Sequence, residues 1–120
     1  MSGTAVEESL SPEDPEDLKL ITLARAALAR GAANQGACVR DTDGRAYAAA
    51  SVHLEHLRLS AIAVAVAMAV SSGANALEAV AVAGVPPSEQ DLDVLRDLPG
   101  SDLAVWTVDV QGQVLDMSQL

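Results

Sequence analysis

A largely apolar segment near the middle of the chain, residues 59–70, constrains the fold more than any other feature. Between Ala61 and Val70 it alternates Ala with a larger residue, a period of two that is also compatible with a strand. However, the segment is long for a strand, Ala is the best helix former, and Gly73 follows as a helix stop. We therefore predict a helix within residues 57–70. Because it is apolar nearly all round, we expect it to be buried on all sides.

Composition narrows the class of protein. The chain has 120 residues, enough for one domain, and 50% are hydrophobic although Tyr47 and Trp106 are its only aromatic residues. Its core must therefore be built from Ala, Val, Leu and Ile. The net charge of −10 argues against a nucleic-acid partner, and the longest apolar run is too short to span a bilayer. We expect a cytoplasmic protein without a membrane segment.

The N-terminal region differs in composition from the rest of the chain. Residues 1–17 are acidic and polar, so we expect a mobile tail there and a single domain over residues 18–120. Ser11-Pro12-Glu13-Asp14 also has the character of a helix start, with a cap, a proline at the first position and acids in the first turn. From Leu18 the apolar pattern is helical, and Gly31 supplies a stop.

The other segments alternate between strand and helix patterns. Strand patterns occur at residues 35–40, 45–50, 77–83, 103–108 and 113–115. An Asp43-Gly44 turn joins the first two into a hairpin. Residues 88–98 form a helical pattern, with Ser88 as its cap and Pro99-Gly100 as its stop. This order predicts an α/β fold in which helices cover both faces of a mixed sheet.

Several local strings carry a resemblance to a known family. They are Gly36-Ala37-Cys38-Val39, Asp43-Gly44-Arg45 with Tyr47, Ser51-Val52-His53, Ala69-Val70-Ser71-Ser72-Gly73 and Leu77-Glu78-Ala79-Val80-Ala81-Val82. In this order they resemble the V-G-A-A-V, D-G, N-V-E and A-V-S-E-G strings of the cytidine deaminase family and the strand that follows them. The resemblance covers Leu18 to Leu115. It implies a cytidine deaminase-like three-layer α/β/α sandwich with a mixed sheet of about five strands.

The residues that carry the family's chemistry are replaced in this chain. Deamination in that family needs three zinc ligands, which lower the pKa of a bound water, and a Glu that moves protons. The resemblance places the first ligand at Ser60 and the Glu at Ile62, and the other two ligands, from P-C-x-x-C, at Ser88 and Asp91. A neutral hydroxyl is a poor zinc ligand, and Ile cannot carry a proton. These catalytic positions are therefore degenerate, and no zinc cofactor is expected.

The positions for substrate recognition and the remaining metal-ligating side chains leave alternatives open. The resemblance places the family's ribose-binding Asn and Glu at Ser51 and His53, which become candidates for a vestigial nucleoside pocket. A relocated metal site near Asp91 could use His53 and His56 if they share a helix face, against the simpler interpretation as two polar loop histidines. The single cysteine, Cys38, excludes an intramolecular disulfide and fits a small buried strand residue better than a reactive thiol.

Three hypotheses for function follow. The first is a catalytically inactive pseudoenzyme that acts as a homo-oligomeric interaction or scaffold protein, with an unidentified protein partner. Active family members are dimers or tetramers, with the apolar helix near the subunit contacts, and the resemblance implies a homodimer or homotetramer here. Alternating alanines along residues 61–69 permit close helix approach. The alternatives are a divergent nucleoside or base deaminase with a relocated metal site, and a non-catalytic nucleoside-binding protein.

Overall fold

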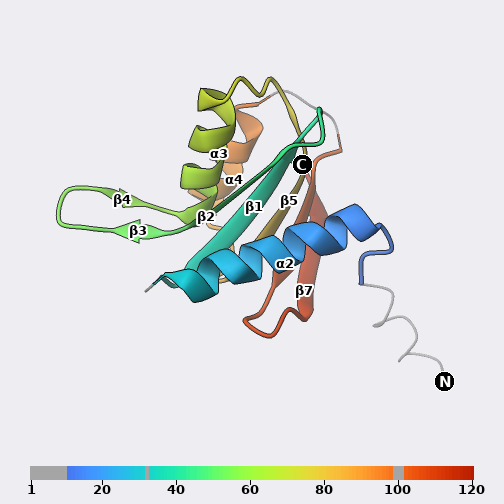
Figure 1. The fold of residues 1–120 in the computed structure, drawn as a ribbon, viewed down its shortest axis with the longest axis horizontal. Helices are drawn as coiled ribbons and strands as arrows, with labels where there is room; N and C mark the ends of the chain where they lie inside the picture. The colour runs from blue at the N-terminus through green and yellow to red at the C-terminus, as the bar shows by residue number, and fades with distance from the viewer. Residues whose placement is uncertain (1–10, 32, 99–101) are drawn as a thin grey trace.

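A mixed sheet lies between two helical layers in the computed structural model, which describes residues 11–31, 33–98 and 102–120. Helix α2 (Pro15–Arg30) covers one face, and helices α3 (Ala61–Ser71) and α4 (Glu89–Arg96) cover the other (Figure 1). This arrangement confirms the predicted α/β/α sandwich. Within the described residues, no helix combines the length and apolar character needed to cross a membrane.

The sheet has five strands in the order β2-β1-β5-β6-β7. Their bounds are β1 Gln35–Asp41, β2 Ala46–Ala50, β5 Leu77–Gly84, β6 Ala104–Val108 and β7 Val114–Gln119. Strands β5 and β6 are parallel and are connected through α4, whereas the other neighbours are antiparallel. The predicted hairpin and mixed sheet are confirmed. The last strand is longer than expected, because it pairs along β6 as far as Gln119.

Helix α2 begins inside the predicted tail. The side chain of Asp14 caps the helix by accepting a 2.9 Å hydrogen bond from the backbone N–H of Glu16, and Pro15 occupies the start of the helix. The helix-start signal in this region was correct in kind, but the cap is Asp14 and not Ser11. The predicted boundary after Asp17 therefore falls within a helix. Residues 1–10 of the predicted tail lie outside the described residues.

The apolar segment forms a helix, as predicted, but a shorter one. The hydroxyl oxygen of Ser60 caps α3 by accepting from the backbone N–H of Ala63 at 3.0 Å, so residues 57–59 precede the helix. Five α3 residues are buried, and they are Ala61, Ile62, Ala65, Val66 and Ala69. The expectation of burial on all sides is wrong, because Met68 and Val70 are 40% and 50% exposed. One face of this helix packs on the sheet, and the other faces solvent in the single chain.

A small hairpin that the sequence did not predict precedes α3. Strands β3 (Val52–His53) and β4 (Arg58–Leu59) pair antiparallel and form a two-stranded sheet of their own. Figure 1 shows this hairpin projecting away from the body of the domain at the base of α3. We call residues 52–59 the arm. Its leucines are exposed, and they are Leu54, Leu57 and Leu59.

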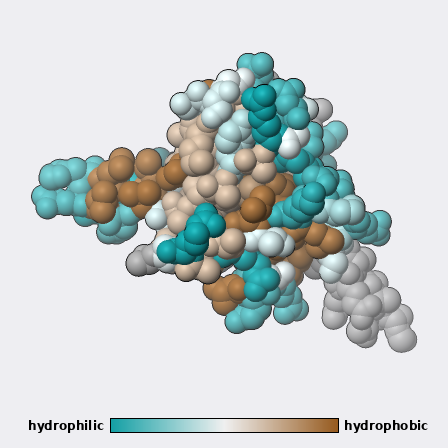
Figure 2. All heavy atoms as spheres, viewed as in Figure 1, coloured by the Kyte–Doolittle hydropathy of each residue, from teal (hydrophilic) through white to brown (hydrophobic). Residues whose placement is uncertain are grey.

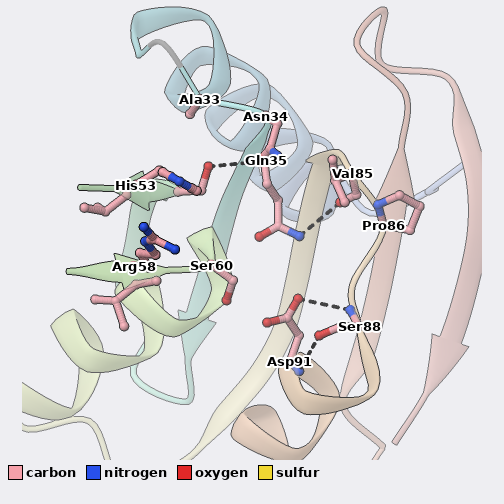
Figure 3. A pocket seen from close by; sticks show the side chains of 13 residues that line it. Ala33, Asn34, Gln35, His53, Arg58, Ser60, Val85, Pro86, Ser88 and Asp91 are labelled. Atoms are coloured by element: carbon pink, nitrogen blue, oxygen red, sulfur yellow. Dashed lines mark hydrogen bonds between the residues drawn. The ribbon is translucent and has the colours of Figure 1, made fainter. Parts of the chain in front are cut away.

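Helix α4 follows the prediction closely. Ser88 is its cap, as the sequence indicated, and the helix runs to Arg96. The predicted stop at Pro99-Gly100 lies outside the described residues. Because α3 and α4 both begin at the same end of the sheet, near the base of the arm, their first turns flank a common hollow (Figures 1 and 3).

Candidate functional site

A pocket of about 700 Å³ lies between the arm and the first turns of α3 and α4. Figure 3 shows its walls, with His53 and Arg58 on one side, Ser88 and Asp91 on the other, and Ser60 between them. Most of the predicted site residues line it, namely Ser51, His53, Ser60, Ser88 and Asp91. Residues that the sequence placed far apart are therefore gathered around one cavity.

The side chain of Gln35 fixes the start of α3 at the rim of this pocket. Gln35 is 3% exposed, its Nε2 donates to the carbonyl of Val85 at 3.0 Å, and its Oε1 accepts from the backbone N–H of Ala61 at 2.8 Å. One amide from β1 therefore satisfies a carbonyl just after β5 and the N–H of the first residue of α3. Gln35 was not among the site residues predicted from the sequence. A polar side chain at the first position of a buried strand was the available signal.

The predicted ligand positions on α4 form a reciprocal helix cap. Ser88 Oγ accepts from the backbone N–H of Asp91 at 3.1 Å, and Asp91 Oδ2 accepts from the backbone N–H of Ser88 at 3.0 Å. This capping box satisfies two backbone donors that the helix start would otherwise leave without partners. Asp91 is only 6% exposed, so its carboxylate is held in place by the helix that it caps.

Ile62, which the family resemblance predicts at the position of the proton-carrying Glu, is not among the residues that line the pocket. Its side chain is fully buried in the cluster beneath α3, with neighbours that include Val39 and Val80. A carboxylate at this place would lose its hydration among aliphatic side chains. The position has therefore become part of the hydrophobic core.

The two histidines do not share a helix face, so that part of the relocated-site hypothesis is wrong. His53 lies in β3, whereas His56 lies in the turn of the arm, where its Nε2 is 3.3 Å from a carboxylate oxygen of Glu55. His56 does not line the pocket. Among the residues that the structure describes, no group of three or more His, Cys, Asp or Glu side chains could hold a metal ion.

The donor set around the pocket does not fit the zinc ion of the family. Ser60 and Ser88 offer neutral hydroxyls, and both oxygens already accept backbone hydrogen bonds. Zinc sites in proteins use thiolate, imidazole and carboxylate groups, usually three or four together. Asp91 is the single such group among the three ligand positions, and its Oδ2 is part of the capping box.

Cys38 lies away from the pocket, in the middle of β1. It is fully buried, and burial raises the pKa of its thiol to about 11, against smaller lowering effects from a backbone hydrogen bond with Tyr47 and the charge of Arg40. The thiol is thus protonated at neutral pH, which fits the predicted small buried strand residue.

Comparisons with known proteins establish the family. The model of the family described as "Cytidine deaminase-like" matches residues 13–112, and the chain belongs to this family. None of the curated proteins searched matches the chain.

Solved structures with a similar fold are cytidine deaminases. The enzyme from Burkholderia pseudomallei has 24% sequence identity and a TM-score of 0.75, with 84% of this chain and 90% of that chain covered. For Mycobacterium leprae the values are 21% and 0.67, with 84% and 90% covered. For Mycobacterium tuberculosis they are 26% and 0.64, with 72% and 80% covered. These likenesses agree with the fold that the sheet order defines.

Proposed function

We propose that this protein is a deaminase-fold pseudoenzyme that acts as a homo-oligomeric interaction or scaffold protein. The observation that carries the proposal is the use of the ligand positions. Ser60 caps α3, and Ser88 and Asp91 cap α4. Helix capping stabilises a fold by roughly 0.5–2 kcal/mol per cap, so these side chains have a structural reason to be where they are.

The absence of a proton carrier points the same way. In deamination a Glu moves protons between the zinc-bound water and the base. Ile62 stands at this position and is buried in the core. Among the residues that line this pocket, none of those at the predicted zinc-ligand positions is of the type with which the family activates water on a metal or transfers protons.

A segment without charged residues supports the homo-oligomer. No Asp, Glu, Lys, Arg or His occurs from residue 59 to residue 77, although the chain as a whole has a net charge of −10. The outer face of α3 exposes Met68 and Val70, and the arm, which projects from the base of this helix (Figure 1), exposes its leucines. Helices that face water normally carry polar residues there. Figure 2 shows the hydrophobic residues of the arm on the surface.

The occupant of this surface that the charge pattern favours is a second copy of the chain. Two copies with the same large negative charge repel each other over most of their surfaces. The outer face of α3 together with the arm leucines is a region where they can meet with little repulsion and bury apolar side chains, each worth about 1.5–3 kcal/mol when fully buried. We propose contact through these elements, as a homodimer or homotetramer.

The first experiment measures metal content and deamination together. Untagged protein is analysed for zinc against protein concentration and is assayed with cytidine and cytosine, with a cytidine deaminase as a positive control. We expect well below one zinc per chain and no turnover. About one zinc per chain with measurable deamination would contradict the pseudoenzyme proposal.

The second experiment tests the oligomer by light scattering after size exclusion. Met68→Glu and Leu57→Glu place a charge on the proposed contact and should shift the mass toward that of one chain. Val110→Glu is the matched control, because Val110 is 57% exposed in the β6–β7 turn, away from that surface. A monomeric parent protein, or equal effects of all three variants, would exclude this interface.

The persistence of the pocket favours one further candidate, a non-catalytic nucleoside-binding protein. Ser51 and His53, at the family's ribose positions, still line the cavity, and Ser51 Oγ donates to Asn34 Oδ1 at 3.1 Å. Thermal unfolding with a series of nucleosides and bases would show stabilisation if one binds to the folded state. No comparable observation favours a relocated metal site.

A further inference from the structure

The arm places two cationic or hydrogen-bond-donating side chains on one wall of the pocket. His53 and Arg58 are direct partners in the β3–β4 pairing, so their side chains lie on the same face of the arm. Both line the cavity, as Figure 3 shows. Arg58 Nε donates to the carbonyl of Leu54 at 3.1 Å, which anchors the guanidinium group to the backbone of the arm.

Within the described residues the guanidinium of Arg58 has no acidic partner, as is also true of Arg25, Arg30 and Arg45, but of these four Arg58 is the one that lines the pocket. The sequence has 17 Asp and Glu residues against 7 Lys and Arg. Arg40 pairs with Glu78, and Arg96 pairs with Asp93. Over the described ranges, Arg58 makes no ion pair within 4.0 Å. Its two terminal nitrogens are therefore available to an anionic group in the pocket.

The opposite wall of the pocket, at the start of α4, carries an acidic side chain. The carboxylate of Asp91 lies there, nearly buried and fixed by the capping box. It repels an anionic group and attracts hydroxyl or amino groups that donate hydrogen bonds. Between the two walls, the oxygen of Ser60 accepts from the backbone of α3, which leaves its hydroxyl hydrogen free to donate. The pocket thus has a cationic end at the arm and an acceptor end at α4.

This polarity selects a ligand with an anion at one end and hydrogen-bond donors at the other. Arginine binds phosphate through two parallel hydrogen bonds, and an imidazole adds a third donor. Ribose hydroxyls and the amino groups of bases supply donors for a carboxylate. A cavity of about 700 Å³ is within the range of small-molecule sites. We propose that this pocket binds a ribose phosphate or nucleoside monophosphate, with the phosphate at Arg58 and His53 and the donor groups toward Asp91.

Sugar-phosphate binding goes beyond the proposed pseudoenzyme function and does not depend on it. Binding is measured separately from zinc content and turnover, so each idea can fail without the other. The test uses matched pairs, ribose 5-phosphate against ribose and cytidine 5′-monophosphate against cytidine, with inorganic phosphate alone as a third probe. Affinities are measured by calorimetry at low ionic strength. We expect the phosphorylated member of at least one pair to bind about tenfold more tightly or better.

Two variants assign the preference to the cationic wall. Arg58→Gln and, independently, His53→Ala should reduce the preference for the phosphorylated member toward one. Arg45→Gln is the matched control, since it removes the same charge from the exposed β1–β2 turn outside the pocket. All variants change exposed residues, and circular dichroism checks that each is folded.

Three results would overturn the proposal. The first is an equal affinity for both members in each pair. The second is a preference for phosphate that survives Arg58→Gln, which would place the phosphate elsewhere. The third is binding of inorganic phosphate as tight as that of the sugar phosphates, which would show that the acceptor end contributes nothing.

Discussion

In the central strands the two faces of the sheet are built from side chains of different size. Toward α2, strands β1 and β5 present small residues, namely Gly36, Cys38, Ala79, Ala81 and Ala83, whereas the neighbouring β6 adds Trp106 and Val108 on the same face. Toward α3 and α4 the sheet presents branched ones, and the main ones are Val39, Val80, Val82 and Val105. The Ala-Val alternation of β5 produces this difference directly, since successive side chains of a strand point to opposite faces.

This difference sets how each helix layer is held. Because the side chains toward α2 are small in β1 and β5, this helix lies close to these strands. A Cβ added to Gly36 would come within 2.2 Å of the carbonyl oxygen of Ala24. The same layer is tied by polar contacts, since Arg40 Nη2 is 3.0 Å from Asp17 and Trp106 Nε1 donates to Asp17. On the other side of the sheet, the inner face of α3 packs its aliphatic side chains against the branched residues of the strands. Both helices leave large apolar side chains exposed, Leu18 and Leu23 on α2 and Met68 and Val70 on α3, so the two layers differ in their contacts with the sheet and not in the exposure of their outer faces.

The largest effect is expected at the closest approach of helix and sheet. In Gly36→Ala the added Cβ would meet backbone atoms of α2, the Ala24 oxygen at 2.2 Å and the Leu28 nitrogen at 2.7 Å, which cannot move as a side chain can. We expect a loss of about 4 kcal/mol or more in the free energy of unfolding. Urea denaturation measures it.

Gly31→Ala is the matched control for this prediction. A Cβ at Gly31 would have its nearest neighbour at 3.5 Å, an ordinary van der Waals contact, and Gly31 has a negative φ. Its unfolding free energy should change by less than about 1 kcal/mol. If Gly36→Ala were as mild as this control, α2 would not lie as close to β1 as described.

A substitution that creates a cavity tests the packing between α3 and the face of the sheet with branched side chains. Ile62→Ala removes a fully buried side chain from the cluster under α3 and should cost about 3 kcal/mol, with Ile62→Val costing about 1 kcal/mol. The exposed Val110 serves as control, since Val110→Ala should change stability by about 0.5 kcal/mol or less. A small effect of Ile62→Ala would show that this side chain is not in the core, and the position would be free to act in the pocket after all.

A smaller and pH-dependent effect is expected at Asp41, at the far end of β1 on the branched face. Burial by itself raises the pKa of this carboxyl, but hydrogen bonds from the Arg45 N–H, the Tyr47 O–H and the Asp43 N–H outweigh it and lower the pKa. The stabilisation is therefore fully present above the ordinary pKa near 4 and is lost as the pH falls through the lower, folded-state value.

Asp41→Asn should accordingly cost about 1–2 kcal/mol at pH 7 and much less near pH 2. Asp43→Asn, at an exposed residue of the same turn, is the control and should differ little from the parent protein at either pH. Urea denaturation at the two pH values gives both numbers. A cost of Asp41→Asn that did not shrink on acidification would mean that the charge of the carboxylate is not what the turn uses.

The elements of the sheet and of the helices could largely be predicted from the sequence. Two segments have nearly the same Ala-Val alternation but different secondary structure, so periodicity alone could not have predicted both. Residues 61–70 form a helix, whereas 79–83 form a strand. Length, the Ser60 cap and Gly73 separate the first from the second, because a helix needs caps and several turns while a buried strand is short. The exposed side of α3 could not be predicted from a pattern that is apolar all round.

The candidate site was only partly predictable. Ser51, His53, Ser60, Ser88 and Asp91 do line one pocket, as the family resemblance implied. Arg58 and Gln35 were missed. The arm that carries Arg58 is a two-residue ladder on each side, too short for a periodic signal, and it replaced the first turn of a predicted helix. Gln35 matters through a bridge to Val85 and Ala61, and its polar side chain at the start of a buried strand does not indicate which groups, so distant in sequence, it contacts.

The smallest effect is expected at Cys38, and it separates the two faces most cleanly. Cys38 is buried on the α2 side, and its raised pKa keeps the thiol protonated. A thiol-specific reagent such as dithiobis(nitrobenzoate) at pH 8 should therefore not label the folded protein, but should label it fully in guanidinium chloride. In Gly36→Ala, where the added Cβ displaces α2 from the sheet, labelling of Cys38 should become fast under native conditions. In Ile62→Ala, where the cavity lies across the sheet, any faster labelling can come only from global unfolding. Equal native labelling in both variants, at matched unfolded fraction, would mean that the two layers do not open independently.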